Sequence, residues 1–387
     1  MKEGWDYKTI GEVIDHLRTG LNPRTHFKLN TPDAEGYYIT VRELKGFAIE
    51  PDEKTDKVNR AAIKRINERS NLKIGDVLFS GTGTIGKTAL VSELPVNWNI
   101  KEGVYAMTPK HSELNSKYFI YYIGSDLFLR LVNDKAAGTG VRSIPMKELV
   151  KLPISIPSLT EQQSIVDYLD SAFAKIDAMK ANAEKALNEA KALFQASLKE
   201  MLEPKEGWEE KKFGDVCWYN KNNGIHKGTR YVGMEHIEQG TGRLLGTISS
   251  DDVLSNTFAF SKGDVLYGRL RPYLKKVIVA DFDGCCSTEI FPIQSKEIVA
   301  SFLMYWFLTD EITNKVNATC AGCRMPRGNM NDVLKFDISY PPHSEQQSIV
   351  ETLDSLKSKV DRLQENYDKI SQECDALKQA ILRHVFE

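Results

Sequence analysis

One short segment has the residues of a nucleotide-binding loop. Gly81–Thr88 satisfies the pattern GxxxxGK[ST] and follows an apolar, strand-like run, as phosphate-binding loops do. Taken by itself, this segment predicts an NTPase in which Lys87 and Thr88 contact the phosphates. Such a loop also needs a helix directly after the lysine, so that the amides of its first turn face the phosphates. The chain leaves room for only about two helical turns before Pro95, which disfavours the NTPase.

Cysteines are the other residues whose spacing suggests chemistry. Cys320 and Cys323 are spaced like a pair of zinc ligands, and Cys285 and Cys286 could supply two more thiolates. Adjacent cysteines are poor partners for one tetrahedral ion, so we expect no metal site and no cofactor. No serine or histidine has the partner residues that hydrolysis requires. The nearest string to an adenine-methyltransferase tetrapeptide is 340–343, which does not match, and we therefore expect no catalytic residues.

The composition indicates a chain with more than one folding unit. Its 387 residues, of which 41% are hydrophobic and 27% charged, exceed one ordinary domain and can bury more than one core. No apolar run approaches the roughly 18 residues of a membrane span, and no targeting segment is visible, so we expect a cytoplasmic protein without membrane contact. Lysine and arginine total 51 against 53 acidic residues, so the overall charge gives no indication of nucleic-acid binding.

The two halves of the sequence repeat one another in an ordered way. The shared strings, each with its two starting residues, are Gly-Trp (Gly4, Gly207), GDVL (Gly75, Gly263), EQQSIV (Glu161, Glu345) and LDS (Leu169, Leu353). This duplication predicts that each half folds as a globular region followed by a long helix. The resulting division is a first globular region (1–152), a first helical region (153–203), a second globular region (204–336) and a second helical region (337–387).

Both helical regions have the apolar pattern of a coiled coil. Apolar residues recur at alternating intervals of three and four, and helices of about 40 residues, near 60 Å long, must cover such stripes. We expect the two helices to pair antiparallel within the chain, although each could instead pack on its own globular region or pair with another chain. The predicted seam of the first helix consists of Leu169, Ile176, Ala183, Ala186 and Ala190, with Ala172 and Met179 between them and Leu193 after them. That of the second helix consists of Leu353, Val360, Leu363, Tyr367 and Ile370, where the last three face the alanines.

Each globular region is expected to be a mixed α/β module. Runs such as Asp76–Phe79 and Val277–Val279 predict strands, whereas Lys117–Leu131 and Phe302–Leu308 predict aromatic helical segments. The expected fold is therefore two α/β modules and two long helices that pair as an antiparallel coiled coil, with a pseudo-twofold internal repeat.

This arrangement resembles the specificity subunit of a type I restriction-modification enzyme. Two dissimilar globular regions alternate with two similar helical regions, each opened by prolines and EQQ, and the resemblance covers essentially the whole chain. It implies a DNA-reading subunit without catalytic activity, whose two target-recognition domains each bind one half of a split sequence in double-stranded DNA. It also implies that the helices space the two halves and dock methyltransferase subunits, two per chain, and it leaves room for restriction or translocase subunits.

Loops of the globular regions carry the residues that we expect to contact DNA. The segment of the second half aligned with Gly81–Thr88 has lost its three glycines, which indicates a turn between strands with a retained lysine, Lys87 or Lys275. Basic and polar side chains on protruding loops suit phosphates and base edges, although a solvated charged turn is the alternative. The candidate DNA-binding residues are Thr84, Lys87, Arg142, Arg269, Arg271, Tyr273, Lys275, Arg324 and Arg327.

Three functions therefore compete. The leading interpretation is a DNA specificity subunit, which would bind DNA and assemble with enzymes without acting as one. The second is a P-loop NTPase that uses Gly81–Thr88, and the third is a coiled-coil scaffold that binds protein only.

Overall fold

The computed structural model describes residues 4–94, 96–138, 140–219, 222–320 and 324–387. Contacts divide the chain into unit 1, made of Met1–Asn182 and Lys369–Glu387, and unit 2, made of Ala183–Asp368. Each unit holds one globular module and part of each of two long helices, α7 (Leu159–Leu202) and α12 (His343–Phe386). Among the described residues, no helix is long and apolar enough to cross a membrane.

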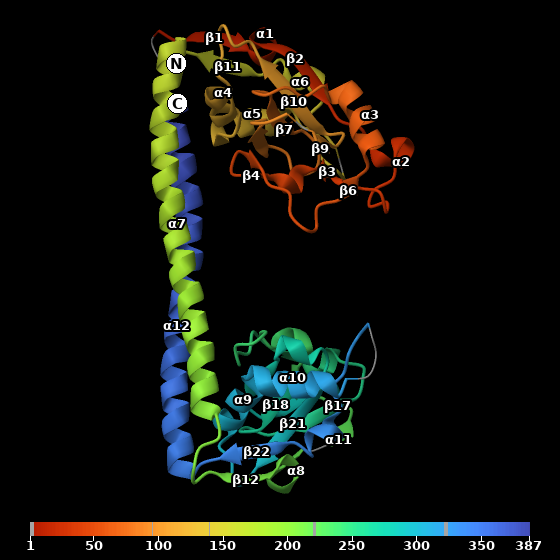
Figure 1. Ribbon diagram of the computed structural model, residues 1–387, viewed down its shortest axis with the longest axis vertical. Coiled ribbons are helices and arrows are strands. Elements are labelled where there is room, and N and C mark those ends of the chain that lie inside the picture. The colour runs from red at the N-terminus through yellow and green to blue at the C-terminus, as the bar shows by residue number, and fades with distance from the viewer. Residues whose placement is uncertain (1–3, 95, 139, 220–221, 321–323) are drawn as a thin grey trace. The chain divides into compact units, whose positions relative to one another are not determined.

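The centre of the first module is a four-stranded antiparallel sheet in the order β2-β10-β7-β8 (Figure 1). Its strands are β2 (Ile14–Thr19), β7 (Val77–Ser80), β8 (Thr88–Leu90) and β10 (Val104–Pro109). Successive side chains of a strand point to opposite faces. Phe79 packs in a core with helices α4 (Ser116–Ile123) and α5 (Asp126–Lys135), whereas Leu78 packs in a second core with Trp98. The sheet is therefore covered on both faces, and every residue of β7 is buried.

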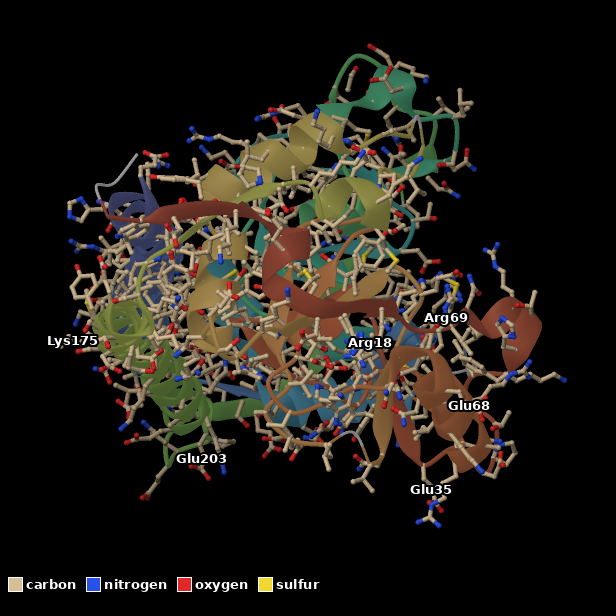
Figure 2. The ribbon with its side chains drawn as sticks, turned by 90° about the horizontal axis from the view of Figure 1, so that it is seen from above. Arg18, Glu35, Glu68, Arg69, Lys175 and Glu203 are labelled. Atoms are coloured by element: carbon tan, nitrogen blue, oxygen red, sulfur yellow. The ribbon has the colours of Figure 1, made fainter. Side chains whose placement is uncertain are left out.

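A smaller sheet covers the face of the central sheet to which Leu78 points. Strand β3 (Gly36–Ile39) pairs parallel with β9 (Trp98–Ile100) and antiparallel with β6 (Lys57–Val58). Helix α3 (Arg60–Ser70) packs on it, with Glu68 and Arg69 on its exposed side (Figure 2). The remaining elements are β1 (Asp6–Thr9), its partner β11 (Pro153–Ile156), β4 (Leu44–Lys45), β5 (Ala48–Ile49), α1 (Ile10–Val13), α2 (Pro23–His26), α6 (Met146–Leu149) and the 3₁₀ turn η1 (Val41–Glu43).

The second module repeats this plan. Its antiparallel sheet has the order β13-β21-β18-β19, with strands β13 (Cys217–Tyr219), β18 (Val265–Gly268), β19 (Val277–Val279) and β21 (Ile290–Ser295). Its helices are α8 (Phe213–Val216), α9 (Ala300–Leu308), α10 (Asp310–Ala318) and α11 (Met330–Val333), and β12 (Glu209–Lys212) pairs with β22 (Asp337–Tyr340). The predicted mixed α/β fold and the internal repeat are confirmed.

The second sheet of this module is larger than its counterpart. It has five strands, β14 (Asn223–Gly224), β15 (Arg230–Val232), β16 (Ile248–Ser249), β17 (Thr257–Phe260) and β20 (Gly284–Ser287). Two short 3₁₀ turns accompany it, η2 (Met234–His236) and η3 (Ser250–Asp252), whereas η4 (Pro272–Leu274) lies in the hairpin between β18 and β19 of the other sheet. After its edge strand β16 the chain makes only η3, where the first module has the 11-residue helix α3 after β6.

The repeated string EQQ attaches each long helix to its module. Gln162 is fully buried, and its amide nitrogen donates to the carbonyls of Glu113 (2.8 Å) and Pro157 (2.9 Å) while its oxygen accepts from the Asn115 amide (2.8 Å). Gln346 makes the same set of contacts, with Glu297 O (3.1 Å), Pro341 O (2.9 Å) and Val299 N (2.7 Å). Buried amides need such partners, so the duplicated sequence reflects a duplicated junction.

Two other repeated strings, Gly-Trp and LDS, meet at the same junction. The Trp5 indole donates to Glu161 Oε1 at 2.9 Å, and Trp208 donates to Glu345 Oε1 at 3.2 Å. The aspartate of each LDS string accepts from a tyrosine hydroxyl of its module, and these pairs are Tyr121 with Asp170 and Tyr305 with Asp354 (2.5 Å). These strings lie far apart in the sequence but together form the contact between a module and the start of its long helix. Each unit contains one such contact.

Within each unit the two long helices lie side by side and run in opposite directions (Figure 1). In unit 1, Lys378 Nζ donates to Asp177 Oδ1 at 2.5 Å, and the Cys374 thiol lies 3.8 Å from the Ile176 carbonyl oxygen. In unit 2, Lys191 Nζ donates to Gln364 Oε1 at 2.8 Å. Higher numbers in α7 meet lower numbers in α12, so the predicted antiparallel pairing within one chain is confirmed.

Burial corrects part of the predicted seam. Ala186 is exposed and Leu187 is buried beside it, while Met179 and Leu193 are exposed by 58% and 60%. The buried positions of α7 follow Leu169 by four and then three residues, because the large side chains Phe173, Leu187 and Phe194 lie on that stripe. The other predicted seam residues are buried (Leu169, Ile176, Leu353) or half-buried (Ala183, Ala190, Val360, Leu363, Tyr367, Ile370).

The long helices begin after the starts of the predicted helical regions. These regions were expected to begin at residues 153 and 337, but α7 begins at Leu159 and α12 at His343. The residues between them form strands β11 and β22, which pair with the first strand of each module. The prolines therefore follow or begin a module strand, and the helix starts only after them.

Candidate nucleic-acid interface

The loop with the phosphate-binding pattern is the turn of a β-hairpin. It connects β7 to β8, which pair antiparallel with Phe79 opposite Thr88. Thr88 is therefore a buried strand residue, and no helix follows Lys87 to face a phosphate with its amides. Gly83 and Gly86 have φ values of +79° and +97°, which suit a tight turn. The glycines serve a hairpin, and this geometry removes the basis of the NTPase interpretation.

The first module brings its candidate residues together on two touching loops. The amide of Gly83 donates to the Arg142 carbonyl at 2.9 Å, so the hairpin loop 81–87 packs against the loop 140–143. Thr84, Lys87 and Arg142 are exposed, and the Arg142 guanidinium also donates to the Asn133 carbonyl at 3.0 Å. Among the described residues, no hydrogen bond or ion pair involves the Lys87 ammonium group. We call residues 81–87 and 140–143 the first loop surface.

The second module builds the same pair of loops with other side chains. The Arg271 amide donates to the Pro326 carbonyl at 2.7 Å, and the Gly328 amide donates to the Arg269 carbonyl at 2.9 Å. Arg271 has a left-handed backbone, with φ of 52°, and is exposed. Tyr273 and Arg324 are exposed as well. We call residues 269–276 and 324–328 the second loop surface.

The lysines of the second hairpin differ from the expectation. Lys275 is only 15% exposed, and its ammonium group donates to Leu308 O (3.0 Å) and Asp310 Oδ1 (2.6 Å). The residue that matches Lys87 is Lys276, because the carbonyls of both accept from the last residue of the preceding strand. Lys276 Nζ donates to the Met234 carbonyl at 2.6 Å. Both lysines are thus engaged within the module, since the second loop is one residue longer and turns its lysines inward.

A shared carboxylate joins the two arginines nearest to the sheet. Glu289 precedes β21, and its Oε2 accepts from Arg269 Nε at 2.9 Å while its Oε1 accepts from Arg327 Nε at 2.7 Å. Arg269 comes from the hairpin and Arg327 from the neighbouring loop. Glu289 is not among the residues expected from the sequence, where its one signal is an acidic residue directly before an apolar strand.

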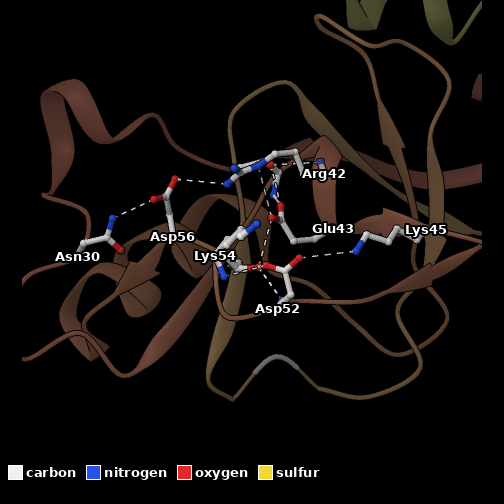
Figure 3. A network of polar contacts seen from close by, with 9 residues as sticks. Asn30, Arg42, Glu43, Lys45, Asp52, Lys54 and Asp56 are labelled. Atoms are coloured by element: carbon white, nitrogen blue, oxygen red, sulfur yellow. Dashed lines mark hydrogen bonds and ion pairs between the residues drawn. The ribbon is translucent and has the colours of Figure 1, made fainter. Parts of the chain in front are cut away.

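A polar network surrounds Arg42 and Glu43 of the turn η1 (Figure 3). Glu43 is buried and accepts from the amide (2.8 Å) and the hydroxyl (2.7 Å) of Thr40, which closes the turn η1. This turn presents Arg42, whose guanidinium lies 3.7 Å from Asp56 Oδ2 and borders a hollow of about 340 Å³. Thr82 of the hairpin loop lines the same hollow. Arg42 is thus a further cation close to the loop surface that sequence analysis did not single out.

The cysteines are placed as interior residues. Cys285 and Cys286 are buried on β20, and burial raises the pKa of both thiols. Burial also raises the pKa of Cys320, whereas Cys323 lies outside the described residues. In the described part of the chain, no group of three or more histidine, cysteine or acidic side chains is arranged to hold a metal ion.

The sequence of this chain matches a known protein family. A family model described as the type I restriction modification DNA specificity domain matches the chain twice, at residues 2–189 and 205–372. The chain belongs to this family of type I specificity subunits. Each match takes in one globular module together with much of the helix that follows it. The family resemblance noted in the sequence is therefore confirmed, and so is the duplication.

Relatives of this specificity subunit span most of its length. The type I restriction enzyme EcoDI specificity subunit of Escherichia coli is 25% identical over 351 residues, which cover 80% of this chain and 77% of that protein. The StySPI specificity subunit of Salmonella potsdam is 20% identical over 419 residues, covering 100% of this chain and 89% of its own.

Solved structures share its fold. A chain from a study of complex assembly and conformational transition of the type I R-M system has a TM-score of 0.72 at 17% identity and covers 100% of this chain and 98% of its own. The HsdS subunit from Thermoanaerobacter tengcongensis has a TM-score of 0.51, also at 17% identity, with coverage of 100% and 97%. These likenesses concern the fold alone.

The family decides between the competing functions. The chain is a DNA sequence-recognition subunit of a type I restriction-modification system, and its role in that system is not catalytic. Neither the NTPase nor the protein-only scaffold finds support in the relatives.

Proposed function

We propose that each module of this specificity subunit reads one half of a bipartite sequence in double-stranded DNA through its loop surface. The observation that carries this proposal is the equivalence of the two surfaces. In both modules a hairpin loop meets a second loop through matching backbone hydrogen bonds, with Gly83 to Arg142 in one and Arg271 to Pro326 in the other. Two loop surfaces with the same backbone arrangement and different side chains can recognise two different half-sites.

The exposed side chains of these surfaces suit different parts of the duplex. We assign Lys87, with Thr84 beside it, to phosphates, because an ammonium group on a flexible stem acts as a point charge. We assign Arg142, Arg271 and Arg324 to base edges, since a planar guanidinium can make two parallel hydrogen bonds. Tyr273, half-exposed beside them, offers a ring and a hydroxyl to the same groove.

The paired helices would determine the spacing between the half-sites. Among the described residues, helix α7 is the one helix or strand between β11, the last strand of the first module, and β12, the first strand of the second, so it links the two readers. At about 1.5 Å per residue, its 44 residues would be near 66 Å long. A continuous helix would keep constant both the distance and the rotational angle between the two half-sites, as recognition of a bipartite target requires.

An exposed apolar stripe on α7 suits a protein partner. Tyr168, Met179 and Leu193 are exposed by 54%, 58% and 60%, and with Ala186 they recur at intervals that place them on one face of the helix. Leu377, 47% exposed, takes the position of Leu193 in α12. We propose that the stripe of α7 and the surface around Leu377 of α12 dock methyltransferase subunits, two per chain because the helices are duplicated. Restriction or translocase subunits would join that complex in the cytoplasm, and no cofactor is assigned to this chain.

Sequencing of modified bases in the host genome, with and without this gene, tests the proposed function. We expect methyladenine to disappear from one split motif when the gene is removed, because the partner methyltransferases lose their guide. The two halves of that motif and its spacer would then be read directly. An unchanged methylation map in a host that expresses the methyltransferase subunits would contradict the proposal.

A further inference from the structure

We propose that Glu289 is a positioning residue for DNA reading by the second module. It holds Arg269 and Arg327 so that their terminal guanidinium nitrogens meet guanine edges in the major groove of one half-site. This inference rests on the proposed function and adds to it the base that is read and the residue that prepares the readers.

The ion pairs with Glu289 leave the terminal guanidinium nitrogens of Arg269 and Arg327 available as hydrogen-bond donors. Each arginine gives its Nε to a separate oxygen of Glu289, at 2.9 Å and 2.7 Å. A guanidinium has five N–H donors, so the terminal nitrogens remain for another partner, apart from a 3.3 Å contact of Arg327 Nη1 with the Met325 carbonyl. A bidentate contact to guanine O6 and N7 uses two such donors. Arg269 and Arg327 are 33% and 41% exposed, so a base edge can reach them.

The backbone around the triad is held in place. The Arg269 amide donates to the Glu289 carbonyl at 2.9 Å, and the Glu289 amide donates to Ser287 Oγ at 3.2 Å. The Arg269 guanidinium lies 5.4 Å from the ring centre of Phe291, on the strand that follows. With a carboxylate only 21% exposed at its centre, the triad fixes both arginines before DNA arrives. Preorganised readers lose less conformational entropy on binding.

The first module cannot contain this device. The three matching positions are Gly81, Gly103 and Ser143, as the hydrogen bond from Gly81 N to Gly103 O (2.8 Å) and the bridge from Thr82 to Ser143 show. A Cβ atom at Gly81 would lie 2.1 Å from the Tyr105 ring. Side chains at these positions therefore distinguish the modules, and any effect of Glu289 should be confined to one half-site.

The charge of the triad favours bases over phosphates. One carboxylate between two guanidinium groups leaves a single positive charge, whereas Arg271 and Arg324 nearby keep theirs in full. The carboxylate repels a phosphate that approaches out of register, and a site that penalises wrong contacts gains discrimination. Removing this carboxylate should therefore raise affinity for unrelated DNA while it lowers selectivity.

The test uses E289Q, which keeps the size of the side chain and removes its charge. The variant chain is assembled with its methyltransferase subunits and used to select from a library of randomised duplex DNA. We expect guanine preference at positions of one half-site to fall by about tenfold or more, with the other half unchanged. Binding to unrelated DNA should become more salt-dependent, with the slope of log K against log salt steeper by about 1.

Three further variants control this experiment. R269K and R327K keep the charge but cannot make the forked contact, so each should relax one guanine position even if E289Q folds poorly. E297Q removes another carboxylate of the same module, which is bonded to Lys211 Nζ at 2.6 Å away from the loops, and should leave base preference unchanged.

Different outcomes would contradict the role of Glu289 and the proposed function. Lower melting temperature and weaker binding in E289Q, with base preferences intact, would make the triad a structural salt bridge and overturn the inference. A half-site pair without guanine at any position affected by R269K or R327K would overturn it as well. A wild-type complex that selects no sequence at all would instead contradict the proposed function.

Discussion

At the scale of single residues, lysines that look alike in sequence have different tasks. Lys87 is exposed on its hairpin, whereas Lys275 reaches the carbonyl of Leu308 at the end of α9 and the carboxylate of Asp310. A cation at the last carbonyls of a helix satisfies groups that the helix itself leaves unpaired. Lys275 therefore joins the hairpin to the α9–α10 corner, and we predict that it does not contact DNA.

We predict opposite effects of K87A and K275A. K87A should leave the free energy of unfolding unchanged and weaken binding to every DNA sequence, with the salt slope reduced by about 1. K275A should lower the free energy of unfolding by about 1 kcal/mol, because two hydrogen bonds of the ammonium group are lost. Chemical denaturation and DNA binding at two salt concentrations measure both quantities. Unchanged stability with weakened DNA binding in K275A would show that this lysine reaches the duplex.

Asp170 gives a prediction about pH. Burial raises the pKa of its carboxyl, but hydrogen bonds from Lys117 Nζ (2.6 Å) and the Tyr121 hydroxyl outweigh burial, so the pKa is lower in the folded protein. A depressed pKa stabilises the fold above the unfolded value of about 3.9, and this stabilisation is lost as pH falls through the folded pKa. The stability difference between wild type and D170N should therefore shrink below about pH 4.

Thermal unfolding between pH 7 and pH 3 measures this difference. D167N is the matched control, because Asp167 is exposed on the same helix and lies one turn from Asp170. Parallel curves for wild type and D170N over the whole range would contradict the role given to Asp170.

At the scale of elements, α7 carries two apolar stripes that overlap in sequence. One contains Phe173, Leu187 and Phe194 and is buried, and the other contains Met179 and Leu193 and is exposed. Both satisfy the spacing of three and four residues, because neighbouring residues of a helix are only about 100° apart. The aromatic and branched residues fill the seam, and the exposed stripe is the surface that we propose for a partner.

Aspartate at adjacent positions of α7 distinguishes the two stripes. L187D should lower stability by about 3 kcal/mol or more, since it places an unpaired charge at a position that is only 3% exposed. A186D should change stability by less than about 0.5 kcal/mol and should instead weaken assembly with methyltransferase subunits. Thermal unfolding and sedimentation of the mixed subunits measure the two effects. Equal destabilisation by both substitutions would mean that Ala186 also lies in the seam.

At the scale of the whole molecule, each module should be exchangeable. Replacing residues 204–336 with the equivalent region of a specificity subunit that has another target should change one half of the methylated motif. The other half and the spacer length should stay as they were, because the first module and both long helices are unchanged. Sequencing of modified bases in a host that carries the chimera measures this. A change in both halves would show that the modules do not read independently.

The amino-acid sequence by itself determined the duplication, the antiparallel helices and the family. These features can be predicted from the sequence because each depends on short strings of residues that few other residues could replace. Gln162 and Gln346, for example, must each satisfy buried backbone groups at a junction, so the same string stands in both halves. The heptad pattern of α12 can likewise be recognised within one continuous segment of the sequence.

Only the tertiary structure decided which side chains of a segment meet other segments. Glu289 joins arginines that stand 20 and 38 positions away along the chain, and no spacing rule relates them. The choice between Ala186 and Leu187 depends on the surface that α12 offers, and the inward turn of Lys275 depends on a hairpin longer by one residue. Each of these outcomes results from packing between segments distant in sequence, where the free energy depends on geometry that residue order does not contain.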